Sequence, residues 1–353
     1  MFAGIGRVLR ITAAPVAAGV AASACGISFS NTEAEPAHLR EQYNELKSRP
    51  EYARLLEAES RRHSSDLLEA VSRRHSSDGV VILEDGLSPN EWRPLKLQTI
   101  TPLSHDTAVY RFAYSDMRAT SGMRVASCLW VRAAIGSTKA DGSRANVIRP
   151  YTPISRPDDR GFLDLAVKTY PDGKMSQHVA SLKVGETLEM KGPVVKLPYR
   201  RNEHARIGMV AGGTGIAPML QVIDEILVGE SAFGPDRTKV SLIFANVSEQ
   251  DILLKQEVDR RAAAHPDRLE VFYLVDQASS VDWRGGVGYV TKQMLAERMP
   301  PPGSENRVFV CGPPPMVKAV CGAKGTKEDR NGQGELSGML KELGYSPEEV
   351  FKF

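Results

Sequence analysis

The chain has 353 residues, of which 42% are hydrophobic and 25% charged, a mixture typical of globular proteins rather than of disordered, collagen-like or multi-span membrane proteins. At about 150 residues per domain, this length predicts roughly two folded domains. The 45 Lys and Arg nearly balance the 43 Asp and Glu, which leaves a formal charge of +2 and indicates no nucleic-acid partner. Four cysteines, at positions 25, 128, 311 and 321, form no CxxC pair and no Cys/His cluster, so we expect neither a disulfide framework nor a metal site.

Residues 1–32 have the composition of a targeting segment. They contain no acidic residue, and Arg7 and Arg10 precede a stretch from Ile11 to Phe29 that is mostly Ala, Gly, Val and Ser. A mitochondrial presequence, a single weak membrane anchor, a secretory signal and a plain disordered tail all remain open. We expect a mitochondrial location, in the outer membrane or the intermembrane space, with membrane attachment through this segment as one alternative.

Residues 33–86 are charged and helix-prone, and they contain a tandem repeat of twelve residues. The two copies are LLEAESRRHSSD at 55–66 and LLEAVSRRHSSD at 67–78. Architectures built of stacked repeats need longer units and about three or more copies. We therefore expect a partly helical spacer that carries no catalytic residue.

Residues 87–201 are predicted to form the first folded domain. Short β-branched, aromatic or alternating runs are separated by Gly, Pro, Asp and Ser, at 95–100, 107–114, 128–133, 161–170 and 187–191. Several short strands with such punctuation predict a small antiparallel β-barrel.

Two segments of this domain suit a large anionic and aromatic cofactor. The first is RPYTPIS at 149–155, in which Arg149 offers a planar fork of donors to a phosphate, Tyr151 a flat ring and Thr152 a hydroxyl. The second, GKMS at 173–176, is predicted to be a turn that presents successive backbone N–H groups to a pyrophosphate. Each segment alone is also compatible with a purely structural role.

Residues 205–353 are predicted to form a second, α/β domain. An apolar strand at 207–211 runs into GGTGIAP at 212–218 and then into a helical pattern that continues to Leu227. This order presents free backbone N–H groups and a positive helix end to a phosphate, and Pro218 suits the first turn of that helix. Further strands at 240–245, 269–275 and 307–310 alternate with helical stretches, which indicates a parallel sheet.

Two polar or glycine-rich segments follow strands of this predicted sheet, where α/β sheets bind their ligands. CGPPPM at 311–316 follows one strand, and Asp276 follows another. The Asp276 carboxylate suits a ribose hydroxyl and would repel a 2′-phosphate, and residues 277–280 supply no Arg or Lys. This pattern favours NADH over NADPH.

Two expectations concern the C-terminal part. Cys321 and the polar, Gly-rich run at 322–334 are predicted to form a mobile loop. Ser346 to Glu349 are predicted to cap and begin a final short helix, with Phe351 and Phe353 packing behind it.

The motifs RPYTPIS and GKMSQH, followed by GGTGIAPM and VCGPPPM, resemble in order and spacing those of the ferredoxin reductase superfamily, and within it the NADH-cytochrome b5 reductase family. The tail GELSGMLKELGYSPEEVFKF and the phrase QDILL at 250–254 resemble the mitochondrial form of that family. The resemblance covers Trp92 to Phe353. It implies an antiparallel β-barrel FAD domain followed by a parallel-sheet α/β NADH domain.

The resemblance also implies a set of site residues. Thr152, Lys168 and Cys311 would be the catalytic residues, which orient the reacting rings of FAD and NADH. The residues that would bind the two cofactors are Arg149, Pro150, Tyr151, Thr152, Val167, Lys168, Tyr170, Gly173, Lys174, Met175, Ser176, Gly212, Gly213, Thr214, Gly215, Asp276, Cys311, Gly312, Pro313, Pro314 and Met316.

By the same resemblance, hydride would pass from NADH to FAD, and electrons would leave singly to a cytochrome b5-like haem protein. A reductase of the same superfamily that serves ferredoxin or a quinone is the alternative. A non-enzymatic function, as a nucleotide-binding scaffold without redox activity, is a further alternative, which the complete set of motifs disfavours.

Overall fold

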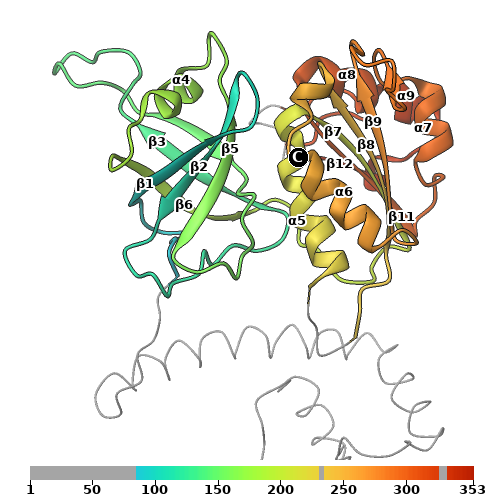
Figure 1. The fold of residues 1–353 in the computed structure, drawn as a ribbon, viewed down its shortest axis with the longest axis horizontal. Coiled ribbons are helices and arrows are strands. Elements are labelled where there is room, and N and C mark those ends of the chain that lie inside the picture. The colour runs from blue at the N-terminus through green and yellow to red at the C-terminus, as the bar shows by residue number, and fades with distance from the viewer. Residues whose placement is uncertain (1–84, 230–233, 326–331) are drawn as a thin grey trace, which may run out of the picture. The chain divides into compact units, whose positions relative to one another are not determined.

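The computed structural model describes residues 85–229, 234–325 and 332–353. The expectations for residues 1–32 and for the repeat at 55–78 lie outside these ranges, as does nearly all of the expected spacer at 33–86. None of the helices in the described ranges combines the length and the apolar character needed to cross a membrane. The described residues form two six-stranded sheets (Figure 1).

The first sheet is antiparallel throughout and has the strand order β4-β3-β6-β1-β2-β5. We call it, together with the helix α4, the barrel domain. Its inward side chains, among them Leu97, Phe112 and Leu129, are fully buried in one apolar core. The strands are β1 (Arg93–Pro102), β2 (Thr107–Ala113), β3 (Ser127–Ala133), β4 (Val147–Tyr151), β5 (Phe162–Lys168) and β6 (Thr187–Val195).

The two outer strands of this sheet approach each other just beyond β4. The Ile154 backbone N–H donates to the Asp164 carbonyl of β5 at 2.9 Å, and the Asp164 N–H donates to the Ser155 hydroxyl at 3.0 Å. Pro150, which has no N–H to donate, lies on the outer strand β4, where a proline does least harm to a sheet. These contacts join the two edges of the antiparallel sheet, as the predicted barrel requires.

The GKMS segment is not the isolated turn that the sequence analysis predicts. Gly173 is the N-cap of an α-helix, α4 (Lys174–Ser181), and residues 174–176 are its first turn. Met175 and Val179 lie four positions apart and are both buried in the barrel core, so this spacing supplies one apolar helix face. The segment still presents backbone N–H groups, because the first turn of a helix leaves them without intrahelical partners.

The second sheet is parallel, with the strand order β10-β9-β8-β7-β11-β12. We call this sheet and its helices the α/β domain. Adjacent residues of its central strands point to opposite faces and are all buried, as Met209 and Val210 show, which is typical of a sheet covered on both sides. The strands are β7 (Arg206–Gly212), β8 (Lys239–Asn246), β9 (Leu269–Val275), β10 (Gly286–Val287), β11 (Asn306–Cys311) and β12 (Val350–Lys352).

Helices cover both faces of this sheet (Figure 1). On one face, α5 (Ile216–Leu227) and α6 (Lys255–Ala264) pack over residues such as Phe244. On the other face, α7 (Lys292–Arg298), α8 (Pro314–Cys321) and α9 (Gly338–Glu342) pack over residues such as Ile243. The short 3₁₀ helices are η1 (Gly213–Gly215), η2 (Glu249–Asp251) and η3 (Pro347–Glu349).

One C-terminal expectation is wrong and one is confirmed. Cys321 does not belong to a loop: it is the buried last residue of α8, where its thiol donates to the Val317 carbonyl at 3.4 Å. The expected short helix after Ser346 is the 3₁₀ helix η3, which begins with a capping box between Ser346 and Glu349 and is followed at once by β12. β12 pairs with β11, and Phe351 and Phe353 pack edge-on against Phe309 and each other behind the helix, as expected.

The strand order fixes where a ligand would bind to the α/β domain. The chain runs from β7 outward through β8 to β9 and β10, and then returns to the opposite side of β7 to form β11 and β12. The direction of winding therefore reverses between β7 and β11. Parallel sheets bind ligands at the carboxyl ends of strands at such a switch point, and the GGTG and CGPPPM segments follow these two strands.

Candidate functional site

The RPYT segment lies at the end of β4, an outer strand of the barrel domain. Arg149 and Pro150 are exposed, while Tyr151 and Thr152 are half-buried. Tyr151 packs against the barrel core, and burial raises the pKa of its phenol to about 12. The segment therefore offers an accessible guanidinium and, next to it, a neutral aromatic ring that can donate a hydrogen bond.

The first turn of α4 is the second predicted contact of this domain. The Ser176 hydroxyl donates to the Gly173 carbonyl at 2.9 Å and accepts from the Tyr170 N–H at 3.1 Å, so it stabilises the helix start. Met175 is buried in the core, whereas Lys174 is exposed. Backbone amides and one lysine, rather than the serine hydroxyl, are the groups that an anion would meet here.

Lys168 ends strand β5, opposite Thr107 on β2. Its ammonium lies 2.6 Å from the Asp106 carboxylate, and its side chain is only 22% exposed. The neighbouring Val167 belongs to the core, and Tyr170 is exposed just beyond the strand. An open hollow of about 590 Å³ borders Asp106 and continues past Thr169, a volume within the range of sites that hold a ring system.

The glycines of GGTG and CGPP are in direct contact. A Cβ atom on Gly215 would lie 2.2 Å from the Cys311 carbonyl oxygen, and one on Gly212 would lie 2.7 Å from the Pro313 ring. A Cβ atom on Gly312 would likewise lie 3.0 Å from the Gly212 backbone nitrogen. The carboxyl ends of β7 and β11 can approach this closely only because these positions lack side chains.

The remaining residues of the two α/β-domain motifs surround this contact. Thr214 belongs to η1, and Gly213 has a φ of +53° with open space where a Cβ would stand. Pro313 caps α8, Pro314 is its first residue, and Met316 is half-buried. Cys311 is also half-buried, and burial raises the pKa of its thiol to about 11, so the thiol is neutral near pH 7.

The two domains meet at these motifs. Strand β5, which ends at Lys168, lies against η1. On α5, the Gln221 side-chain amide donates to the Pro153 carbonyl at 3.4 Å and accepts from the Ser127 N–H at 3.3 Å. The structure therefore brings the glycine turn, Lys168 and the end of RPYTPIS into one region.

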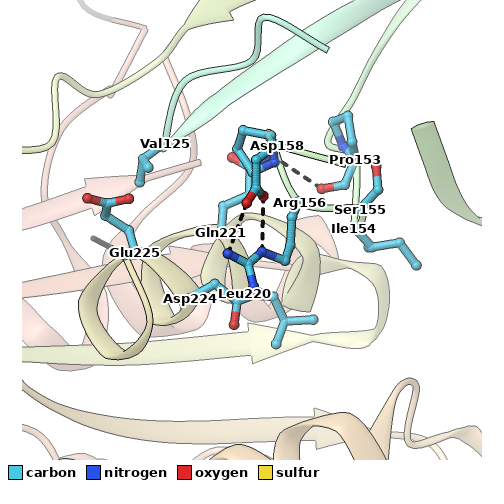
Figure 2. A pocket seen from close by; sticks show the side chains of 12 residues that line it. Val125, Pro153, Ile154, Ser155, Arg156, Asp158, Leu220, Gln221, Asp224 and Glu225 are labelled. Carbon is cyan, nitrogen blue, oxygen red and sulfur yellow. Dashed lines mark hydrogen bonds and ion pairs between the residues drawn. The ribbon is translucent and has the colours of Figure 1, made fainter. Parts of the chain in front are cut away.

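A small cavity at this junction is not the cofactor site. It lies between residues 153–158 of the barrel domain and α5, next to an exposed Arg156–Asp158 ion pair (Figure 2). Its volume is about 60 Å³, which suits one or two water molecules rather than a nucleotide.

Asp276 lies at the carboxyl edge of the α/β sheet, as predicted, directly after β9. A second acidic residue that the sequence analysis missed contacts the segment that follows Asp276. One Glu249 oxygen accepts the backbone N–H groups of Ser279 and Ser280 at 3.0 and 2.8 Å. These two backbone amides are thereby occupied by a carboxylate and are not free to bind another anion.

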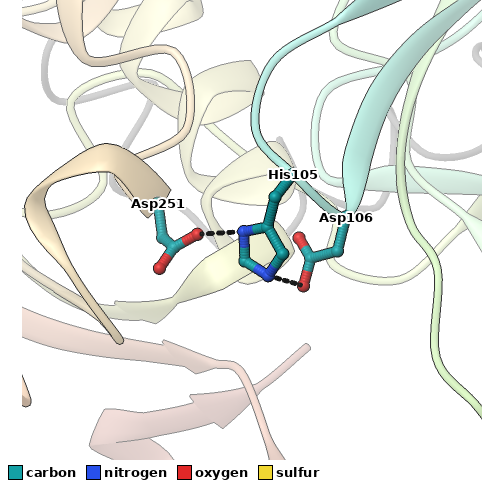
Figure 3. Close-up of side chains that lie close together, drawn as sticks. All are labelled: His105, Asp106 and Asp251. Atoms are coloured by element: carbon teal, nitrogen blue, oxygen red, sulfur yellow. Dashed lines mark ion pairs between the residues drawn. The ribbon is translucent and has the colours of Figure 1, made fainter.

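Sequence reasoning also missed an exposed aromatic residue and a polar cluster. Tyr289 is 79% exposed two residues beyond β10, at the same sheet edge as Asp276, where a ring can stack on a base. His105, Asp106 and Asp251 cluster at the junction of the domains (Figure 3). No local spacing pattern links His105 to Asp251, because they come from different domains.

Both domains match known families. Residues 94–199 match the oxidoreductase FAD-binding domain, and residues 209–322 match the oxidoreductase NAD-binding domain. A solved structure, the cytochrome b5 reductase domain of Ulva prolifera nitrate reductase, superposes with a TM-score of 0.63 at 30% identity, covering 76% of this chain and all of that one.

Relatives match over most of their length. An NADH-cytochrome b5 reductase-like protein of Arabidopsis thaliana is 50% identical over 267 residues, which are 76% of this chain and 78% of the relative. NADH-cytochrome b5 reductase 2 of Aspergillus niger is 47% identical over 263 residues, 74% of this chain and 77% of the relative.

Proposed function

We propose an electron acceptor and a location for this chain, which belongs to the NADH-cytochrome b5 reductase family. It is an oxidoreductase with an FAD-binding barrel domain and an NADH-binding α/β domain. The electron acceptor that we propose is a cytochrome b5-like haem protein. One observation carries the proposal most: the flavin motif, Lys168 and the glycine turn of the α/β domain, which are far apart in the sequence, meet at one junction.

The donor groups present fit both cofactors. An exposed guanidinium on β4 and the amides of the α4 first turn suit the phosphates of FAD. The open space at Gly213, in η1 just before α5, suits the pyrophosphate of NADH. When bound, FAD supplies the ring that accepts hydride from NADH and releases electrons singly, which no side chain can do.

The side chains that we propose as catalytic residues bind and orient. Thr152 supplies a hydroxyl directly after Tyr151 in the chain, and burial raises the pKa of the Tyr151 phenol to about 12. Lys168 supplies a positive charge at the end of β5, restrained by Asp106. The neutral Cys311 thiol offers a polarizable surface rather than a nucleophile. These three residues lower the barrier by fixing the two rings in a reactive geometry.

Preference for NADH follows from the acidic edge of the α/β sheet. Asp276 can accept from a ribose hydroxyl, and Glu249 occupies the amides of Ser279 and Ser280. Both carboxylates would repel the 2′-phosphate of NADPH, and like charges placed close together cost several kcal/mol.

The acceptor is tested by mixing the NADH-reduced holoenzyme with oxidised cytochrome b5 and following the haem absorbance in a stopped-flow instrument. We expect fast haem reduction that slows as salt is added, since charge steers such encounters. If the flavin is reduced but a ferredoxin or a quinone accepts electrons far faster than cytochrome b5, the alternative acceptor class is correct.

We also propose that the chain is mitochondrial. Arg7, Arg10 and the absence of acidic residues in 1–32 support this location. Fractionation of cells that express the full chain or a chain lacking these 32 residues tests it. Retention of the shortened chain with mitochondria contradicts a targeting role, and release by carbonate extraction excludes an integral anchor.

A further inference from the structure

One imidazole stands between carboxylates of the two domains. His105 lies on the connection between β1 and β2 of the barrel domain, whereas Asp251 is the last residue of η2 in the α/β domain. His105 Nδ1 is 3.2 Å from an Asp251 oxygen, and its Nε2 is 3.5 Å from an Asp106 oxygen (Figure 3). The two ring nitrogens therefore face opposite acidic partners.

On the barrel side, Asp106 is a fixed anion. One oxygen accepts from the Ser104 hydroxyl at 3.0 Å and the Thr107 hydroxyl at 2.9 Å, and the other lies 2.6 Å from the Lys168 ammonium. Partial burial raises the pKa of Asp106, but the hydrogen bonds from Lys168, Thr107 and Ser104 lower it by more, to below its usual value. The position of Lys168 is thus coupled to the Asp106 carboxylate.

In the α/β domain, Asp251 is the last residue of η2 and is held there by its neighbours. Its side chain is only 9% exposed, and its Oδ2 accepts from the Ser248 hydroxyl at 2.6 Å. Within the described residues, its Oδ1 is buried without a hydrogen-bond donor, and His105 Nδ1 lies 3.2 Å from it. A buried carboxylate oxygen of this kind is costly unless a positive group faces it.

The geometry favours an ion-pair chain over a metal site. Each ring nitrogen faces one carboxylate, and the Lys168 ammonium, 2.6 Å from Asp106, already neutralises that carboxylate. We propose that Asp251, His105 and Asp106 are positioning residues that tie the α/β domain to Lys168. This inference rests on the proposed function, because Lys168 acts there on the NADH that the α/β domain brings to the junction.

The proposal is tested in the full-chain holoenzyme with His105→Ala, Asp251→Asn and the double variant. The measurement is the affinity for NAD⁺ by titration calorimetry, together with the NADH KM and kcat. Because His105 is 75% exposed, we expect each single change to weaken NAD⁺ binding by about two- to fivefold, as for ion pairs of this exposure. KM should rise more than kcat falls, and the double variant should be no worse than either single one.

Two further variants make the test specific. His105→Gln keeps a side-chain N–H donor and should recover part of the lost affinity. His265→Ala removes a histidine at the end of α6, outside the chain of ion pairs, and should leave NAD⁺ affinity unchanged. All variants should melt within a few degrees of the natural protein.

Two results overturn the proposal. Either the effects of the two single changes multiply in the double variant, or melting temperature falls while NAD⁺ affinity is unchanged, as for a merely structural contact. Failure of the natural holoenzyme to bind NAD⁺ or to be reduced by NADH would instead overturn the proposed function itself.

Discussion

At the residue scale, three glycines without side chains are as important for the shape of the site as the residues that are proposed to contact a cofactor. Gly212, Gly215 and Gly312 allow the GGTG and CGPP segments to meet. A Cβ on Gly212 or Gly215 would collide with ring or backbone atoms, and one on Gly312 would lie only 3.0 Å from the Gly212 nitrogen. From these glycines the sequence indicates a phosphate-binding turn. Only the structure shows that the GGTG and CGPP segments contact each other.

Replacement of Gly215 by Ala should therefore destabilise the α/β domain. A Cβ 2.2 Å from the Cys311 carbonyl oxygen forces the backbone apart, at a cost of about 1–3 kcal/mol. Urea unfolding of the holoenzyme measures this loss. Gly303→Ala is the matched control, since the nearest atom to its Cβ is the Asn306 amide at 3.8 Å. Equal free energies of unfolding for Gly215→Ala and Gly303→Ala would contradict the close approach of Gly215 to the Cys311 carbonyl.

The Cys311 thiol gives a second prediction. Burial raises its pKa to about 11, and only the thiolate reacts readily with alkylating reagents. Iodoacetamide should modify Cys311 slowly in the folded protein at pH 7 to 8, and the rate should keep rising well above the pH range of an ordinary thiol. Mass spectrometry follows the modification, with the urea-unfolded chain as control. Fast alkylation of the folded protein at pH 7 would show that a thiolate is present.

Asp276 gives a third prediction. Asp276→Asn removes one of the two negative charges near the expected 2′-phosphate position, while the Glu249 contacts to Ser279 and Ser280 remain. The ratio of kcat/KM for NADPH to that for NADH should rise by about tenfold or more. The matched change Asp282→Asn, in the exposed turn after residue 280, should leave the ratio unaltered. An unchanged ratio in Asp276→Asn would remove this residue from the explanation of cofactor choice.

At the element scale, the segment that joins the domains is fixed by one buried carboxylate. Tyr199, which follows β6, donates its hydroxyl to Asp236 at 2.6 Å, and the Thr238 N–H donates to the same side chain at 3.0 Å. Asp236 is 1% exposed. Burial raises its pKa, but the hydrogen bonds from Tyr199 and Thr238 lower it by more, so that the folded-state pKa lies below its usual value.

A depressed folded-state pKa contributes stability that is present above the unfolded-state pKa, about 4, and is lost as the pH falls through the folded value. Asp236→Asn should therefore cost about 1–3 kcal/mol at pH 7. The difference from the natural protein should shrink below about pH 4. Urea unfolding at a series of pH values measures both, and a difference that grows in acid would reverse the assigned sign.

The elements that sequence reasoning missed are those with little local signal. Strand β10 has two residues and β12 has three, and each forms only because a long strand lies next to it. The start of α4 at Gly173 has only a turn signal in the sequence, because the apolar face of this helix, Met175 and Val179, is completed by barrel residues from other strands. Long strands such as β7 and β8, by contrast, carry uninterrupted apolar runs that identify them without a partner.

At the scale of the whole molecule, sequence motifs predict which groups bind the cofactors, but not how the two domains are joined. Gln221, His105 and Asp251 make contacts between domains, and each is unremarkable in its local sequence. Such pairs depend on the folded arrangement of distant segments, so a single sequence holds no periodicity or spacing from which to predict them.

The central claim is that hydride from NADH reaches FAD where the two domains meet. Anaerobic mixing of the full-chain holoenzyme with NADH or with NADPH, followed through the flavin absorbance, tests it most directly. We predict bleaching by NADH that is at least about tenfold faster than bleaching by NADPH. A colourless preparation that does not take up FAD would contradict the assignment of a flavoenzyme, and equal rates with the two donors would contradict the role of the acidic sheet edge.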